Sequence, residues 1–137
     1  GAISRPLPSP PWRIVTALRP VVEEGVDLTR EAGVWLHAAG GRRVGILVQV
    51  LGADRVLVSL REQDEGAAAP VLRGTPHSVA LGEAEAIALR LTLVDGELLA
   101  TSGATELGTV ALAAPERLAL SVSGGAVEFH HLTLAQP

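Results

Sequence analysis

The chain has 137 residues, of which 47% are hydrophobic and 19% charged, which suffices for one folded domain with a core and argues against disorder. The formal net charge is −4 and the basic residues are all arginines without a basic run, so we expect no nucleic-acid partner and no membrane-surface partner. The absence of cysteine excludes disulfides and thiolate metal sites, and no apolar run approaches the roughly 20 residues of a membrane span.

The N-terminal segment is rich in proline and ends in Pro10-Pro11. Proline fixes φ and removes a hydrogen-bond donor, so we expect residues 1–11 to form an extended linker or an arm lying along a sheet edge. Residues 12–18 then alternate between apolar and polar side chains, which predicts a strand that Pro20 ends.

Glycine-containing turns divide the rest of the chain into short apolar segments. Good helix formers occupy residues 28–38 and 83–91, but the period-two alternation of residues 87–93 and the turn Asp95-Gly96 favour strands there. Residues 62–70 are expected to form a long loop. We expect strands over residues 33–39, 43–50, 55–61, 77–81, 87–93, 97–101, 105–112, 117–122 and 126–134, with turns at Gly40-Gly41, residues 52–54 and Gly124-Gly125.

The last predicted strand contains an irregular apolar pattern. Val127 and Phe129 share one face, whereas Leu132 and Leu134 share the face of opposite parity. One extra residue at His130-His131 would place all four side chains on the same side, so we expect a β-bulge there. About nine or ten strands separated by glycine turns predict an all-β fold, either a two-sheet antiparallel sandwich or a barrel.

Residues 11–20 (PWRIVTALRP) and 32–36 (AGVWL) resemble the opening strands of the concanavalin A-like lectin and glucanase superfamily. Residues 87–96 resemble its strand and Asp-Gly turn, and residues 118–134 its closing hairpin. Such domains occur in bacteriophage tail or minor structural proteins and in carbohydrate-active enzymes. The resemblance implies a single jelly-roll β-sandwich over residues 12–137, with one concave sheet. In many members the concave face or its rim binds glycans, sometimes with calcium.

The chain departs from the enzymatic members of that superfamily, because no strand carries their pattern of paired carboxylates. Glu83 and Glu85 have the parity to share a face, but a solvated strand entry is the simpler interpretation. The serines show no nucleophile elbow, so we predict no catalytic residue. Neighbouring residues on a strand point to opposite faces, which disfavours a metal site at His130-His131. The acidic segments 23–27 and 64–65 lack the dense spacing of a calcium loop, so we predict no metal and no cofactor.

A polar face on three predicted strands is the best candidate binding surface. Apolar residues fill one parity of residues 33–39, 43–50 and 55–61. If these strands are neighbours, the other parity brings together the predicted ligand-binding residues Trp35, His37, Gln49, Ser59 and Arg61. An aromatic ring among hydrogen-bonding groups suits a sugar or a polar protein patch. The alternative is an ordinary solvent face with Trp35 tucked under the loop at residues 62–70. Trp12 and Phe129 are expected in the core.

These patterns favour a non-catalytic binding module that recognises a glycan or other surface ligand. We expect it in a phage virion or an exported bacterial protein, and hence at an extracellular or virion location. Position 1 is glycine, so we also expect a processed chain or part of a longer one. The alternative is a structural assembly protein, such as a virion decoration, tail or fibre domain, that forms a homo-oligomer and binds a scaffold. The scarcity of aromatics counts against glycan binding, and the proline-rich arm and aliphatic content favour assembly.

Overall fold

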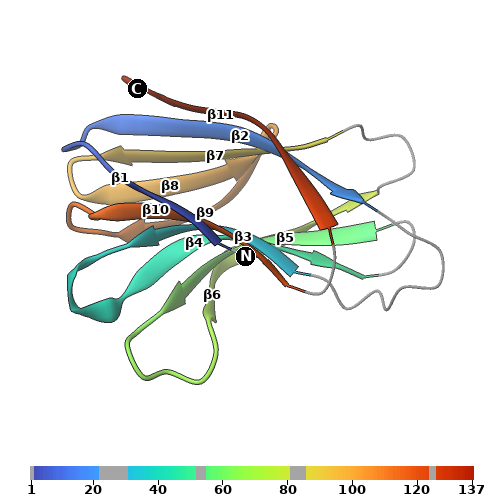
Figure 1. Cartoon of the computed structure of the whole chain (residues 1–137), viewed down its shortest axis with the longest axis horizontal. Helices are drawn as coiled ribbons and strands as arrows, with labels where there is room; N and C mark the ends of the chain where they lie inside the picture. The colour runs from blue at the N-terminus through green and yellow to red at the C-terminus, as the bar shows by residue number, and fades with distance from the viewer. Residues whose placement is uncertain (1, 22–30, 52–54, 81–85, 124–125) are drawn as a thin grey trace.

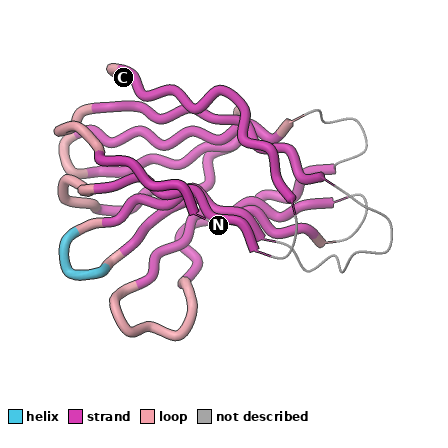
Figure 2. The backbone as a smooth tube through the Cα atoms, in the orientation of Figure 1, coloured by secondary structure: helices cyan, strands magenta, loops and turns pink. Residues whose placement is uncertain are grey.

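The structure is a computed structural model that describes residues 2–21, 31–51, 55–80, 86–123 and 126–137. Strands make up most of the backbone that the structure describes (Figure 2). The strands are β1 (Ala2–Pro6), β2 (Trp12–Val21), β3 (Glu31–His37), β4 (Arg43–Val50), β5 (Arg55–Gln63), β6 (Val71–Ala80), β7 (Ile87–Val94), β8 (Glu97–Ser102), β9 (Thr105–Ala111), β10 (Arg117–Ser123) and β11 (Ala126–Ala135), with one 3-10 turn at Ala39–Gly41.

The strands form two antiparallel sheets stacked as a sandwich (Figure 1). The six-stranded sheet has the order β1-β10-β3-β4-β5-β6, and the five-stranded sheet has the order β11-β2-β7-β8-β9. Every strand pair is antiparallel. The two-sheet sandwich predicted from the sequence is therefore confirmed, with eleven strands among the described residues where nine or ten were expected.

The core lies between the sheets and is built by the alternation seen in the sequence. In β7, residues 87, 89, 91 and 93 are buried and residues 88, 90 and 94 are exposed, which is the period of a half-buried strand. Val34, Ile46 and Leu60 of the six-stranded sheet face them and are almost fully buried. Trp12 lies in this core and Phe129 packs against it, both as predicted.

Short turns confirm two of the expected hairpins. Asp95 (φ 50°) and Gly96 (φ 74°) form the two-residue connection between β7 and β8, the backbone geometry typical of a type I′ turn. The 3-10 turn at residues 39–41 joins β3 to β4, with φ 79° at Gly40. The predicted turns at residues 52–54 and 124–125 lie outside the described residues, as do Glu83, Glu85 and the acidic segment 23–27.

The last strand contains the predicted irregularity. His130 pairs with Ala17 and Thr133 with Val15, so two residues of β11 lie opposite one residue of β2. Phe129 and Leu132, on either side of this bulge, both pack against the core. The prediction fails further along the strand, because Leu134 is 37% exposed.

Several strand boundaries differ from the sequence prediction by one or two residues, and three differences concern segments that contain proline. Strand β2 continues to Val21, so Pro20 does not end it; Pro20 lies one residue from the end of the strand. Strand β6 starts at residue 71 rather than 77; Gly74 and Pro76 lie in the register shift opposite Ser59 on this edge strand, and Gly74 (φ 79°) lies against the backbone of β9 at Leu107. Residues 2–6 pair with β10, so the hydrogen-bonded sheet includes residues on both sides of the predicted domain boundary at residue 12.

Candidate functional site

The outer face of the six-stranded sheet carries two cross-strand rows that define the candidate site. The first row runs over β10, β3, β4 and β5, and the next row runs over the same strands two residues along each. The rows are Arg117, His37, Arg43 and Gln63, and Ala119, Trp35, Gly45 and Arg61. Direct cross-strand neighbours have Cβ atoms about 5 Å apart, so side chains at successive positions of a row lie close together, and in the second row Gly45 leaves the space between Trp35 and Arg61 without a side chain.

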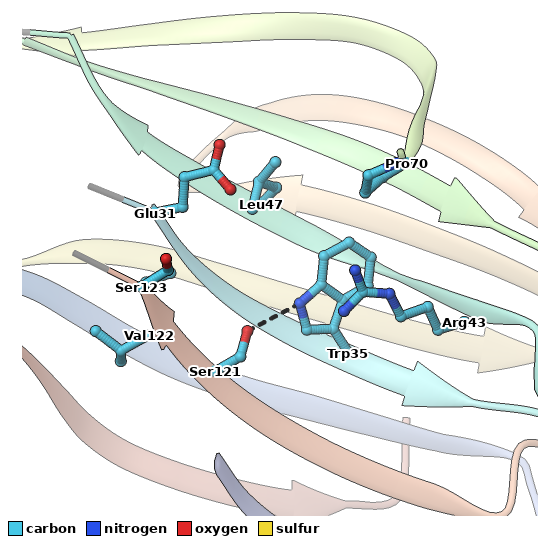
Figure 3. Close-up of a pocket in the computed structure, with 9 residues that line it drawn as sticks. Glu31, Trp35, Arg43, Leu47, Pro70, Ser121, Val122 and Ser123 are labelled. Atoms are coloured by element: carbon cyan, nitrogen blue, oxygen red, sulfur yellow. Dashed lines mark hydrogen bonds between the residues drawn. The ribbon is translucent and has the colours of Figure 1, made fainter. Parts of the chain in front are cut away.

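Trp35 is buried on this outer face, apart from the main core, where it packs with Leu47 and Ala119. Only 2% of the residue is exposed. Its indole lies across Gly33, where a Cβ atom would overlap the ring nitrogen. The indole Nε1–H donates a 3.0 Å hydrogen bond to Ser121 Oγ on β10. The missing side chain at Gly33 therefore lets the ring lie flat over the sheet and point toward β10 (Figure 3).

Arg43 covers the indole from the solvent side. Its Cζ lies 3.9 Å from the centroid of the Trp35 ring, within the range of a cation–π interaction (Figure 3). Nε and Nη2 both donate to Gln63 Oε1, at 2.8 and 2.6 Å. Partial burial lowers the pKa of Arg43 from its ordinary value. The two groups that hold the Arg43 guanidinium, the Trp35 ring and the Gln63 amide, are thus both neutral. Nη1 of Arg43 donates no hydrogen bond to any described residue.

A hollow of about 230 Å³ opens beside this pair. Trp35, Arg43 and Leu47 line it together with Pro70, which precedes β6. At the other end, Glu31 and Ser123 complete a polar rim, and the Ser121 hydroxyl lies next to the indole (Figure 3). The hollow is smaller than the roughly 300–1,000 Å³ of sites that enclose a whole drug-sized ligand, so it fits one ring-sized group of a larger ligand.

All five predicted site residues lie on the strands that present this face. Trp35 is buried under Arg43, and His37 is half-buried two residues further along β3. Gln49 donates a 3.1 Å hydrogen bond to Glu31 Oε1 at the far end of the same strand pair. Ser59 is fully buried, and its Oγ accepts a 2.9 Å bond from Arg61 Nε. The structure thus brings Trp35, His37 and Arg61 near one another and leaves Gln49 apart; their role in binding stays a prediction.

Sequence reasoning left important residues out of the predicted set. Arg43 was not among the predicted site residues, and nothing in the sequence indicated that it would stack on Trp35. Ser121 and Arg117 come from β10, which lies next to β3 in space although more than 80 residues separate them in the chain. Strand order across a sheet is not a local property, so these contributions had no usable signal.

The charges on this face depress the basicity of His37. Burial lowers the pKa of His37 most, and the positive charges of Arg43 and Arg117 lower it further. The neutral form of the imidazole is therefore favoured, and this form can both donate and accept a hydrogen bond.

The described residues contain no group of three or more His, Cys, Asp or Glu side chains placed to hold a metal ion. Among the same residues, no helix is long and apolar enough to cross a membrane.

The comparisons with known proteins bear on the fold. No family model matches the sequence, and no curated protein matches it. The galectin LEC-6 of Caenorhabditis elegans matches over 98% of this chain and 90% of its own, at 12% identity and a TM-score of 0.60. The fold is that of the concanavalin A-like lectins and glucanases.

Two further structures show the range of proteins with this fold. The CBM2 module of the evolved Dit of Lactobacillus casei BL23 phage J-1 matches over 97% of this chain and 64% of its own, at 9% identity and a TM-score of 0.60. A Bacillus licheniformis β-glucanase matches over 97% of this chain and 68% of its own, at 11% identity and a TM-score of 0.57. At these identities the likeness concerns the fold alone.

Proposed function

We propose that this chain is a non-catalytic module that binds a glycan on the outer face of its six-stranded sheet. The observation that carries the proposal is the Arg43–Trp35 stack beside the hollow, with serine hydroxyls and Glu31 around it. Convergent donors and acceptors around an apolar floor are the general arrangement of sites that recognise polar ligands. The galectin and the phage CBM2 module that share the fold lend further support.

Arg43 rather than Trp35 makes the first contact in this proposal. The indole is 2% exposed and covered, so a sugar does not stack on it directly. In this proposal the indole supports the Arg43 guanidinium through the cation–π contact. The side-chain oxygen of Gln63 accepts two hydrogen bonds that fix the orientation of the guanidinium. Such preorganisation lowers the entropy that binding costs. A site of this kind does not need several exposed aromatic rings. The small number of aromatic residues in the chain is therefore compatible with glycan binding.

The number of carboxylates that line the hollow, among the described residues, agrees with binding rather than catalysis. Glycoside hydrolysis needs two carboxyl groups facing one cleft. Glu31 is the carboxylate among the described residues that line the hollow, and the Gln49 amide binds it. We therefore place no catalytic role on this face, although a β-glucanase shares the fold.

The proposed setting is an extracellular or virion protein, supported by the phage module among the structures with this fold. Self-assembly is the second candidate function. Strands β1 and β6 are the edge strands of the six-stranded sheet; β6 lies against β9 at Gly74, whereas Val71 and Leu72 nearer its start are 53% and 38% exposed. Open, partly apolar edges favour strand pairing with another copy or a scaffold. Light scattering of the purified chain separates a monomer from such an oligomer.

A glycan array probed with the wild-type chain and with Arg43→Gln tests the binding proposal. We expect wild type to select a set of glycans and Arg43→Gln to lose them. Arg90→Gln is the matched control, because it removes the same charge from an exposed position on the other sheet. Near-ultraviolet circular dichroism checks that both variants fold. An array on which wild type binds nothing, or on which both variants bind like wild type, would refute this site.

A further inference from the structure

The outer face that we propose as the glycan site carries arginines that no carboxylate neutralises among the described residues. Arg43 is held by Gln63, Arg61 by Ser59 Oγ at 2.9 Å, and Arg117 by Ser4 Oγ at 2.8 Å. All of these acceptors are neutral oxygens. They fix the direction of each guanidinium without cancelling its charge.

This arrangement stands out because the chain is acidic. Its sequence holds 15 acidic residues against 11 arginines, so carboxylate partners are plentiful. Elsewhere on the same sheet they are used: Glu62 accepts from Arg42 at 3.1 Å and from Arg73 at 3.2 Å. A shortage of acidic residues in the chain therefore does not explain why the arginines on the outer face lack carboxylate partners among the described residues.

The arginines form a cationic band that crosses the strands. Arg117 and Arg43 lie on either side of His37 in one row, and Arg61 belongs to the adjacent row. Their strands β10, β3, β4 and β5 are successive neighbours, so at a strand spacing of about 4.8 Å the band extends about 14 Å. Arg61 lies diagonally to Arg43 on the adjacent strand and Arg117 lies two strands away from Arg43, so the three like charges repel one another, and a bound counter-charge offsets that repulsion.

We propose that the ligand of this face is an acidic glycan, whose carboxylate or sulfate groups bind the band formed by Arg117, Arg43 and Arg61. The inference rests on the proposed glycan-binding function and adds the chemical class of the ligand. Guanidinium groups present planar pairs of donors that match the oxygens of carboxylate and sulfate. An elongated band suits an oligosaccharide with repeated charges, and the hollow beside Trp35 takes one sugar ring.

Glu31 limits where the anionic groups bind. It is the acidic residue of the hollow and lies two cross-strand rows beyond Trp35, where the Gln49 amide binds it. The ligand charges therefore sit at the Arg117 and Arg61 ends of the band, away from Glu31. The face thus combines a charged half with a half that offers serine hydroxyls and the Glu31 carboxylate to neutral sugar hydroxyls.

Isothermal titration with three tetrasaccharides tests the inference. The probes are a hyaluronan tetrasaccharide with carboxylates only, a heparin tetrasaccharide with carboxylates and sulfates, and neutral cellotetraose. We expect at least one acidic probe to bind more tightly than cellotetraose, and its affinity to fall as sodium chloride rises from 50 to 300 mM. The stronger of the two acidic probes identifies the preferred anionic group.

Arg117→Gln is the decisive variant, because Arg117 is exposed and its loss does not threaten the fold. We expect it to weaken the acidic probe roughly tenfold, with Arg61→Gln similar. Arg90→Gln on the other sheet should leave binding unchanged. Equal losses in Arg117→Gln and Arg90→Gln would reveal non-specific attraction and overturn the band. Cellotetraose binding as tightly as both acidic probes would overturn the anionic class alone. An array without any bound glycan would overturn the proposed function as well.

Discussion

The arginines around Glu62 and the arginines of the cationic band differ in the partners that hold them. Arg42 and Arg73 share one carboxylate, and Arg42 also donates to the Ala111 carbonyl oxygen at the end of β9. That cluster therefore ties the six-stranded sheet to the five-stranded sheet. Arg43, Arg61 and Arg117 bond only to neutral oxygens among the described residues. The same residue type is thus compensated where it joins the two sheets and uncompensated where the sheet faces solvent.

The contrast indicates two different uses of arginine. A charge neutralised inside the fold contributes to stability, whereas a charge oriented but not neutralised is available to a ligand. Variants at the first cluster should change the free energy of unfolding and leave binding intact. Variants at the band should change binding and leave the free energy of unfolding almost intact.

The largest expected change in stability comes from Trp35, whose ring lies under Arg43 of the cationic band. Trp35→Ala removes a 2% exposed indole, its hydrogen bond to Ser121 and its contact with Arg43. Truncating a buried tryptophan costs about 3–5 kcal/mol, so we expect a loss of that order in the free energy of unfolding, measured by urea denaturation. Trp35→Phe keeps an aromatic ring under Arg43 and should lose less. Wild-type stability in Trp35→Ala would show that the indole is not packed into this face.

Glu62→Gln should give the next largest effect, and on stability alone. It leaves Arg42 without its carboxylate partner, and we expect a loss of about 1–2 kcal/mol in urea denaturation. The figure is modest because the Arg73 side chain is 49% exposed, so solvent screens its share. Binding of the acidic tetrasaccharide should be unchanged. A loss of binding equal to that of Arg117→Gln would erase the distinction between the two groups.

The pH dependence of that effect has a defined sign. The hydrogen bond from Arg42 is the main reason that the pKa of Glu62 is lowered, with the charges of Arg42 and Arg73 adding to it and burial opposing it. A lowered pKa means that the stabilisation is complete above the unfolded-state value of about 4.3 and is lost as the pH falls through the folded-state pKa. The stability difference between wild type and Glu62→Gln should therefore shrink in acid.

Arg117→Gln should have a much smaller effect on stability, in the opposite direction. It removes a positive charge opposite His37 and near Arg43 and gives up one exposed hydrogen bond to Ser4. We expect the free energy of unfolding to stay within about 0.5 kcal/mol of wild type or to rise slightly. Arg90→Gln supplies the reference for removing one charge from an acidic chain. A clear destabilisation by Arg117→Gln would show that Arg117 contributes to stability in the same way as Arg42 and Arg73.

The sequence allowed much of this fold to be predicted, because alternation fixes which side chains face the core. Residues 87–93 predicted strand β7 and its buried face, and the mismatch between Phe129 and Leu132 predicted the bulge in β11. The prolines left residues 1–11 open between a linker and an arm lying along a sheet edge, and the strand predicted to begin at residue 77 begins at residue 71. Residues 2–6 and 71–76 form edge strands, where Pro6 and Pro76 are tolerated because one side of the strand needs no donor.

The candidate site could be predicted only in part, because its contacts cross between strands. Period-two alternation placed Trp35 and His37 on the outer face, as the structure has them. The same alternation could not show that Gly33 frees space for the indole, that Arg43 folds over it, or that β10 brings Ser121 alongside. Neighbouring strands in a sheet can come from distant parts of the chain, so these residues converge only through the topology.

The smallest expected effect, and the most specific one, concerns the proton on His37. Burial and the charges of Arg43 and Arg117 lower its pKa from 6.5. The neutral form is thus favoured in the folded chain, and its contribution to stability is complete above 6.5 and declines as the pH falls toward the folded-state pKa. Arg117→Gln removes one repulsion, so the His37 pKa should rise but stay below 6.5, since burial persists. NMR titration of the imidazole measures this pKa.

A bound acidic tetrasaccharide should raise the His37 pKa by offsetting the charges of both arginines. Acidic ligands should therefore bind more tightly as the pH falls through this range. Cellotetraose should leave the His37 pKa unchanged. An identical His37 pKa with and without the acidic ligand would place the bound anion away from the Arg117–His37–Arg43 row.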